Sequence, residues 1–416
     1  AYVDSQSGGG GTSGIVSTGT GNTAIGSSAL DSITSSANRN TALGFNTLTG
    51  ITSVGSDNVA IGYNAMKAAP DGVSTFGQCV VIGSEAMETS DSAHSVVAIG
   101  YRAGQSTDDW YLCTAVGHGA GGNSNTTNYT QNCTYIGTTS ISDVEANDNT
   151  ALGSSAMSYN TVTGVGNTAL GSRAGARYTS GQHNVAVGYE ASSYISTGSY
   201  NVGIGSQALN GASSGTISGS DNIGIGRVAG STITSGSDNV SIGRSSGNGL
   251  QTGSDNVFVG RSAGQSATGA VSDNVYIGAA AGQGNANNEY NVAVGYEALG
   301  ANSNSTYRST AVGWGAGNTI TGGYNLTVLG HNAEPSSATA LNEFTLGDAN
   351  VATLRCNDQS IGTLSDARDK TNIVDSPFGL DFINSVRPVQ FKWDRRNLVE
   401  GDLTAFKNGK TRLGFI

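Results

Sequence analysis

The repeated motif Asn184-Val185-Ala186-Val187-Gly188 decides the fold of this chain. Nearly the same five residues stand at 22–26, 58–62 and 291–295. Aligned on its last glycine, the motif occurs 19 times between Gly26 and Gly347, at spacings of 16 to 21 residues. Such a period predicts a stack of similar units, each too small to bury a core alone.

The columns of the repeat predict a short strand that ends in a turn. Ile, Leu or Val precedes the glycine in all 19 copies, and Val, Thr or Ile stands two residues earlier in 18 of them. These positions share one face of a strand, and the glycine is typical of a turn with positive φ. Ala follows three residues later in 15 copies, which predicts a second, tightly packed strand. No 3.6-residue apolar period favours a helix.

The fold class that follows is all-β, with a parallel β-solenoid whose turns lie about 4.8 Å apart. The residue two before each glycine is usually Ala, Gly or Ser and is never charged. A strand that is apolar on both faces is buried on both, yet so small a solenoid has one interior. We therefore expect another chain to cover the second face, in a homotrimer of parallel shafts.

Composition and charge exclude several classes of protein. With 63 glycines, 4 prolines, 12% charged and 37% hydrophobic residues, the chain is neither disordered nor collagen-like. It has no apolar run long enough for a transmembrane helix, so we expect no membrane insertion. The net charge of −11, without a basic stripe, argues against nucleic-acid binding.

Charge and repeat pattern together divide the chain. Residues 1–364 carry 10 basic and 23 acidic side chains, whereas residues 365–416 carry 9 and 7. We expect a Gly/Ser-rich linker at 1–21, a solenoid of 19 repeats at 22–351, a neck at 352–364 and a small α+β domain from 365. Because the chain starts at Ala1 and stops on an apolar run, we expect it to be a segment of a longer protein.

Two ladders are predicted along the shaft. Asn fills the position four before the glycine in 12 copies, which predicts a hydrogen-bonded asparagine ladder. Three cysteines occupy the same column and are expected to be buried, with a Cys113–Cys133 disulfide as an open alternative; they are Cys79, Cys113 and Cys133.

Charged side chains also recur. Arg follows the glycine in three consecutive copies, and Asp precedes the Asn in the same stretch. We expect an ion-paired ladder, within the chain or with a neighbouring one; the alternative is a groove for an anionic glycan. The residues are Arg227, Arg244, Arg261, Asp221, Asp238, Asp255 and Asp273. The four histidines are scattered, so no metal site and no cofactor are expected.

The repeat resembles the left-handed β-rolls in the heads of trimeric autotransporter adhesins, and related repeats in phage tail fibres. The resemblance covers residues 22 to about 351. It implies a left-handed solenoid and a trimer. The repeat here is longer than in the adhesins, and the chain lacks their coiled-coil stalk and membrane anchor.

A second resemblance begins at residue 365. The run Ser-Asp-Ala-Arg-Asp-Lys-Thr-Asn-Ile at 365–373 is followed by an expected amphipathic helix near 379–387, a strand at 389–393 and Gly-Phe-Ile at 414–416. This resembles the start of the endosialidase-type intramolecular chaperone domain of phage tail spikes and fibres. The resemblance implies trimer assembly followed by self-cleavage, with Ser365 as nucleophile, Lys370 as its base and Asp366 flanking them.

The resemblances imply a function as the shaft of a bacteriophage tail fibre, located on the virion. Its partners would be two further copies of the chain, other virion tail proteins and a host cell-surface glycan or protein receptor. Long connections offer receptor contacts, and aromatic side chains beside carboxylates suit sugars; the candidates are Asp108, Asp109, Trp110 and Tyr111. The alternatives are a glycan-degrading tail spike and a bacterial trimeric surface adhesin.

Overall fold

The structure is a computed structural model that falls into two compact units, 1–352 and 353–416. Within them it describes residues 15–16, 21–31, 37–49, 55–67, 75–90, 92–105, 109–122, 129–141, 146–211, 217–267, 271–284, 288–300, 306–355, 388–394 and 407–415.

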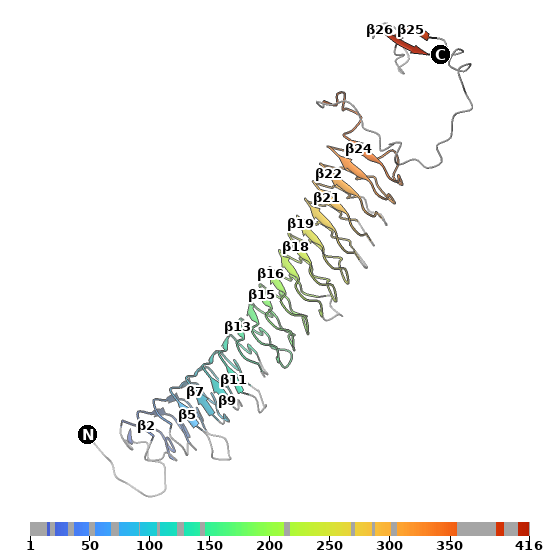
Figure 1. Cartoon of the computed structure of the whole chain (residues 1–416). Coiled ribbons are helices and arrows are strands. Elements are labelled where there is room, and N and C mark those ends of the chain that lie inside the picture. Colours follow the sequence, from blue (N-terminus) through green and yellow to red (C-terminus); the bar gives the residue numbers. More distant parts are fainter. Residues whose placement is uncertain are drawn as a thin grey trace, which may run out of the picture. The chain divides into compact units, whose positions relative to one another are not determined.

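The first unit is a parallel β-solenoid, as predicted (Figure 1). Every glycine-terminated motif forms one three-residue strand, and each strand pairs in register with the next, so that Ala186 lies beside Gly203. We call one turn of the solenoid a rung. The main sheet contains β2 (Thr23–Ile25), β3 (Thr41–Leu43), β4 (Val59–Ile61), β6 (Val80–Ile82), β8 (Val97–Ile99), β10 (Thr114–Val116), β12 (Thr134–Ile136), β13 (Thr150–Leu152), β14 (Thr168–Leu170), β15 (Val185–Val187), β16 (Val202–Ile204), β17 (Ile223–Ile225), β18 (Val240–Ile242), β19 (Val257–Val259), β20 (Val275–Ile277), β21 (Val292–Val294), β22 (Thr310–Val312), β23 (Thr327–Leu329) and β24 (Phe344–Leu346).

Two smaller pieces of sheet accompany the main one. The short strand β1 (Ile15–Val16) pairs antiparallel with β2 at its start. A second parallel sheet forms in four consecutive repeats from β5 (Thr75–Gly77), β7 (Ser92–His94), β9 (Asp109–Tyr111) and β11 (Tyr129–Gln131). The described residues contain no helix.

The middle residue of each strand, which is usually Ala, Gly or Ser, faces the interior, and the Ile, Leu or Val after it does not. Ala24 and Ala60 are buried, whereas Ile25 is 38% and Leu43 42% exposed. The sequence placed the Ile/Leu/Val face in the core and the Ala/Gly/Ser face against another chain, and that assignment is wrong. The interior is too narrow for a branched side chain on every rung, so the larger residues point outward. We call the outward first and third residues of the main-sheet strands the outer stripe.

Side chains inside the solenoid compensate one another in size. In the rung of β4 the inward strand residue is the small Ala60, and the residue four after the motif glycine is the large Met66. In the rung of β19 the sizes are reversed, with Phe258 in the strand and Gly264 after the glycine. A Cβ on Gly264 would lie 2.8 Å from the Phe258 ring. Met66, Met87 and Met157 are all fully buried, which confirms that the methionines pack the core.

The motif glycine allows the backbones of neighbouring rungs to approach closely. Gly243 has φ +126°, and a Cβ there would lie 2.5 Å from the carbonyl oxygen of Gly260. The segment after the glycine was expected to be a strand but consists of turns. Its second and fourth residues adopt positive φ, as Ser28 (56°) and Leu30 (59°) do. Left-handed residues break the strand path there, so this prediction is wrong.

The asparagine ladder is confirmed. Asn222 Oδ1 accepts hydrogen bonds from the backbone N of Asn239 at 3.2 Å and from its Nδ2 at 3.0 Å, while Asn222 Nδ2 donates to the carbonyl of Gly236 at 2.8 Å. The cysteines in this column are buried and free, so Cys113 and Cys133 form no disulfide. Burial raises the pKa of the Cys79 thiol.

In the second unit, β25 (Pro388–Asp394) pairs antiparallel with β26 (Lys407–Phe415), which confirms the strand predicted near 389–393. The expected helix near 379–387 lies outside the described residues. Over the part of the chain that the structure describes, no helix could cross a bilayer, and no cluster of His, Cys, Asp or Glu could hold a metal ion.

Candidate functional site

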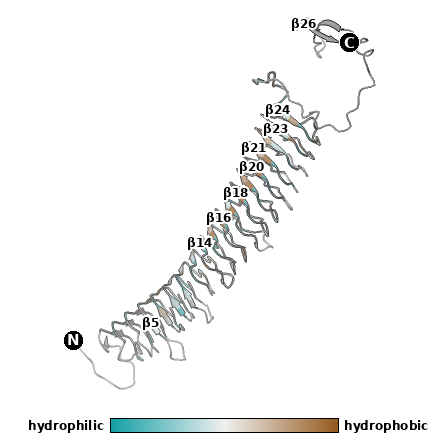
Figure 2. Cartoon of the chain, in the orientation of Figure 1, coloured by the Kyte–Doolittle hydropathy of each residue, from teal (hydrophilic) through white to brown (hydrophobic). Residues whose placement is uncertain are grey.

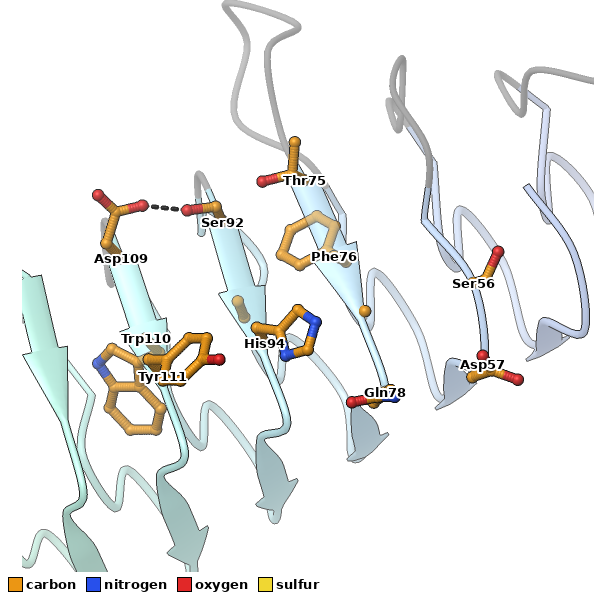
Figure 3. Close-up of a pocket in the computed structure, with 12 residues that line it drawn as sticks. Ser56, Asp57, Thr75, Phe76, Gln78, Ser92, His94, Asp109, Trp110 and Tyr111 are labelled. Atoms are coloured by element: carbon orange, nitrogen blue, oxygen red, sulfur yellow. Dashed lines mark hydrogen bonds between the residues drawn. The ribbon is translucent and has the colours of Figure 1, made fainter. Parts of the chain in front are cut away.

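A groove of about 470 Å³ lies along the second sheet (Figure 3). Three strands of this sheet, β5, β7 and β9, supply most of its lining, and the turn before β4 closes one end. Its lining includes Asp57, Thr75, Gln78, Ser92, His94, Asp109 and Tyr111.

Side chains along each strand alternate between the core and the groove, and this decides which of them the groove presents. Phe76, Ala93 and Trp110 occupy the middle of their strands and are buried. Trp110 is 2% exposed, and its ring packs edge-to-face on Tyr135 with 5.9 Å between centroids. Trp110 therefore supports the groove from the core, and its ring faces are not open to a ligand.

Two stacked rings, those of His94 and Tyr111, form the outward wall of the groove, and we call this pair the aromatic step. The His94 ring stacks on the Tyr111 ring at 5.3 Å between centroids and 24° between planes, and Tyr111 is 37% exposed. The rung before them carries Gly77, where a Cβ would lie 3.2 Å from Cδ2 of His94. The missing side chain lets the imidazole lie against the backbone.

Polar groups border this aromatic step. The Ser92 hydroxyl donates a hydrogen bond to Oδ1 of Asp109 (Figure 3). Ser95 Oγ donates to Oε1 of Gln78 at 3.1 Å and contacts Nδ1 of His94 at 3.1 Å. The wall thus places hydrogen-bonding groups next to ring surfaces.

Asp57 closes the groove with a carboxylate that stays ionised. Nη2 of Arg39 donates to Oδ2 of Asp57 at 2.7 Å, and this hydrogen bond lowers the pKa of Asp57. A glycosidase needs one carboxyl held protonated as general acid. Asp57 does not meet that need, whereas an ionised carboxylate at the end of the groove can accept hydrogen bonds from a hydroxylated ligand.

The structure places three of the four predicted receptor residues. Asp109 and Tyr111 line the groove, Trp110 packs beneath it, and Asp108 lies outside the described residues. His94 and Gln78 were not predicted. The signal was available for His94, because Gly77, His94 and Tyr111 all stand six residues before a motif glycine and therefore share one column.

The residues expected to carry out self-cleavage, Ser365, Asp366 and Lys370, lie outside the described residues. Residues 365–416 match the family model described as the chaperone of endosialidase. A search of curated proteins gave no match. The C-terminal match and the parallel β-solenoid are together consistent with a phage tail fibre or spike.

Proposed function

We propose that three copies of this chain pack their shafts in parallel to form a bacteriophage tail fibre that attaches the virion to its host. The observation that carries the proposal is the outer stripe. It runs the full length of the main sheet, and its third residues are all Ile, Leu or Val that a single chain leaves partly exposed to water.

The outer stripe has the composition of a buried surface. Ile25, Ile277 and Leu346 are 38%, 41% and 47% exposed, and they belong to the first rung, a later rung and the last rung of the main sheet. Figure 2 shows hydrophobic colour on main-sheet strands such as β18 and β21. Monomeric proteins rarely leave so extended an apolar surface in water. A closed ring of parallel copies buries it without leaving an open end.

The C-terminal match supports the same proposal. In this proposal, the domain beginning at residue 365 brings the three chains together and then cuts its own chain beside Ser365. The neutral amine of Lys370 takes the proton of the Ser365 hydroxyl, whose oxygen attacks the carbonyl carbon of the Leu364–Ser365 peptide bond. The C–N bond breaks, the Lys370 ammonium returns the proton to the departing amine of Ser365, and water hydrolyses the resulting ester to free the carboxylate of Leu364. Asp366 flanks this pair. The shaft remains as the working fibre.

Attachment is assigned to the groove on the second sheet. A sugar ring would stack on the exposed face of the His94–Tyr111 step, and its hydroxyls would donate to Asp109 and pair with Gln78. The host receptor is then a cell-surface glycan, and the other virion tail proteins hold the opposite end of the fibre.

The test of assembly and processing uses the complete gene product beside its Ser365→Ala variant, each weighed natively and after denaturation. We expect a native mass of three chains for both, and a cut beside Ser365 in the wild type alone. An uncut wild type refutes self-cleavage, and a monomeric native mass refutes the fibre.

The test of attachment compares host-cell binding of Tyr111→Ala and His94→Ala with that of Tyr159→Ala, which removes an exposed tyrosine elsewhere. We expect the first two variants to lose at least tenfold in binding and the control to match the wild type. Equal binding by all three would exclude the groove as the receptor site.

A further inference from the structure

The outer stripe is bordered on one side by a row of arginines. The side chain after the motif glycine lies beside the stripe, and in the rungs of β17, β18 and β19 it is Arg. Stacked rungs place the backbones of these arginines about 4.8 Å apart, so their like charges repel one another. We call this set the arginine ladder: Arg227, Arg244 and Arg261.

The opposite border of the same rungs is acidic. The residue five before the motif glycine turns the chain into the strand with a left-handed backbone, as in Asp238 with φ +58°. Its side chain is exposed. Four consecutive rungs, those of β17 to β20, carry Asp at this corner. We call this set the aspartate ladder: Asp221, Asp238, Asp255 and Asp273.

The two ladders do not neutralise each other within one chain. The described residues form three ion pairs, Arg39–Asp57, Arg102–Glu85 and Arg173–Glu190, and none includes a member of either ladder. The chain geometry explains this, because the Asp and Arg of one rung are six residues apart and separated by up to about 20 Å of extended strand. Both ladders are exposed, so each is open to a partner outside its own chain.

We propose that the arginine ladder of each copy pairs with the aspartate ladder of the next copy, so that the ladders join neighbouring shafts in parallel. The inference rests on the homo-oligomer of the proposed function and fixes its direction and rung alignment. Rotation about an axis parallel to the shaft brings the basic border of one copy against the acidic border of its neighbour. An antiparallel pairing would bring Arg against Arg.

The lengths of the ladders limit the alignment. Three arginines face four aspartates, so every Arg meets an Asp if opposed rungs are level or if they are offset by one rung toward Asp273. An offset the other way leaves Arg227 unpaired, so the alignment has two allowed values.

Paired cysteines test the inference on the full chain. In the Asp238→Cys/Arg244→Cys variant, or in Asp255→Cys/Arg244→Cys, mild oxidation should link each chain to its neighbour and give a covalent trimer on a denaturing gel. Only the pair that matches the true alignment should react. Asp221→Cys/Arg261→Cys, two rungs apart in the excluded direction, is the matched control and should stay monomeric on the gel.

The outcomes separate the inference from the proposed function. A native trimer in which neither allowed pair cross-links overturns the ladder pairing and leaves the fibre proposal standing. Cross-linking by Arg244→Cys alone also overturns it, because that result means arginine borders meet. A native monomer overturns both. A second test measures the melting temperature of charge-reversal variants. Arg244→Asp should lower the melting temperature of the oligomer, and the triple variant that also carries Asp238→Arg and Asp255→Arg should recover part of that loss.

Discussion

The close approach of rungs at the motif glycine predicts a large difference between two alanine substitutions only two residues apart. Gly117 has φ +138°, and a Cβ there would lie 2.7 Å from the carbonyl carbon of Gly137 and closer still to its oxygen. Gly119 also has a left-handed backbone, with φ +61°, yet the nearest atom to its Cβ would be Cγ2 of Thr139 at 3.6 Å.

The expected cost of Gly117→Ala has two parts. The strained backbone costs about 1–3 kcal/mol. Relief of the clash displaces a rung and weakens the hydrogen bonds from Gly117 N to Ile99 O and from Gly137 N to Val116 O, each 2.8 Å long and worth about 0.5–1.5 kcal/mol. The total is about 2–6 kcal/mol. Gly119→Ala should cost only about 1–2 kcal/mol, the ordinary penalty for a left-handed alanine.

Denaturant unfolding followed by circular dichroism, at one protein concentration, measures both variants. Gly322→Ala serves as control, because Gly322 is not left-handed and its Cβ would meet no atom closer than 3.6 Å; it should be neutral or slightly stabilising. If Gly117→Ala unfolds at the same denaturant concentration as Gly119→Ala, the rungs do not approach at the glycine as described.

Three further predictions concern the outer stripe, the asparagine ladder and the buried tyrosines. Ile277→Asp should split the oligomer, because burying the exposed 41% of Ile277 contributes about 0.6–1.2 kcal/mol per chain and a charge there would be desolvated. The control Gln251→Asp changes an exposed residue elsewhere and should leave the native mass unchanged. An intact Ile277→Asp oligomer would contradict the interface. Asn222→Leu should lower the free energy of unfolding by about 2–5 kcal/mol, because buried groups of the asparagine ladder lose their hydrogen-bond partners. Asn222→Ser should cost less, since Ser309 fills the same column and its Oγ accepts a hydrogen bond from Leu326 N. Equal losses would argue against the ladder. Burial raises the pKa of Tyr178 above its ordinary 10.0, so the contribution of Tyr178 to the free energy of unfolding is present below pH 10 and is lost as the pH rises further. The stability of Tyr178→Phe should therefore fall less steeply above pH 10 than that of the wild type. An unchanged slope of stability against pH would refute this.

The period of the sequence was enough to predict the rungs. Nineteen glycines marked nineteen strands, and the asparagine column predicted the ladder, because each column repeats one local interaction and register follows from spacing. The orientation of the strand was not predictable in the same way. Ala24 and Ile25 are both apolar, so alternation separates the two faces without saying which is inside; the width of the interior decides that, and it is a property of the assembled solenoid.

The turn and the groove depended on information that no single repeat carries. The left-handed residues after each glycine are often non-glycine, as at Met66 with φ +55°, so residue type gave no sign of them. Trp110 was expected at the surface because it was placed in a long connection, but it lies in a strand of the second sheet that turns its ring inward. The groove forms only where four repeats add a second strand, which brings His94 onto Tyr111.

Counting the chains in the native assembly tests the central claim most directly. Native mass spectrometry of the Ser365→Ala form of this chain, which cannot cut itself in the proposed way, should give three times the 41.8 kDa chain mass, because the outer stripe of each copy is buried by two others. A dominant species of 41.8 kDa would contradict the account, since a stripe of partly exposed Ile, Leu and Val would then face water along the whole main sheet.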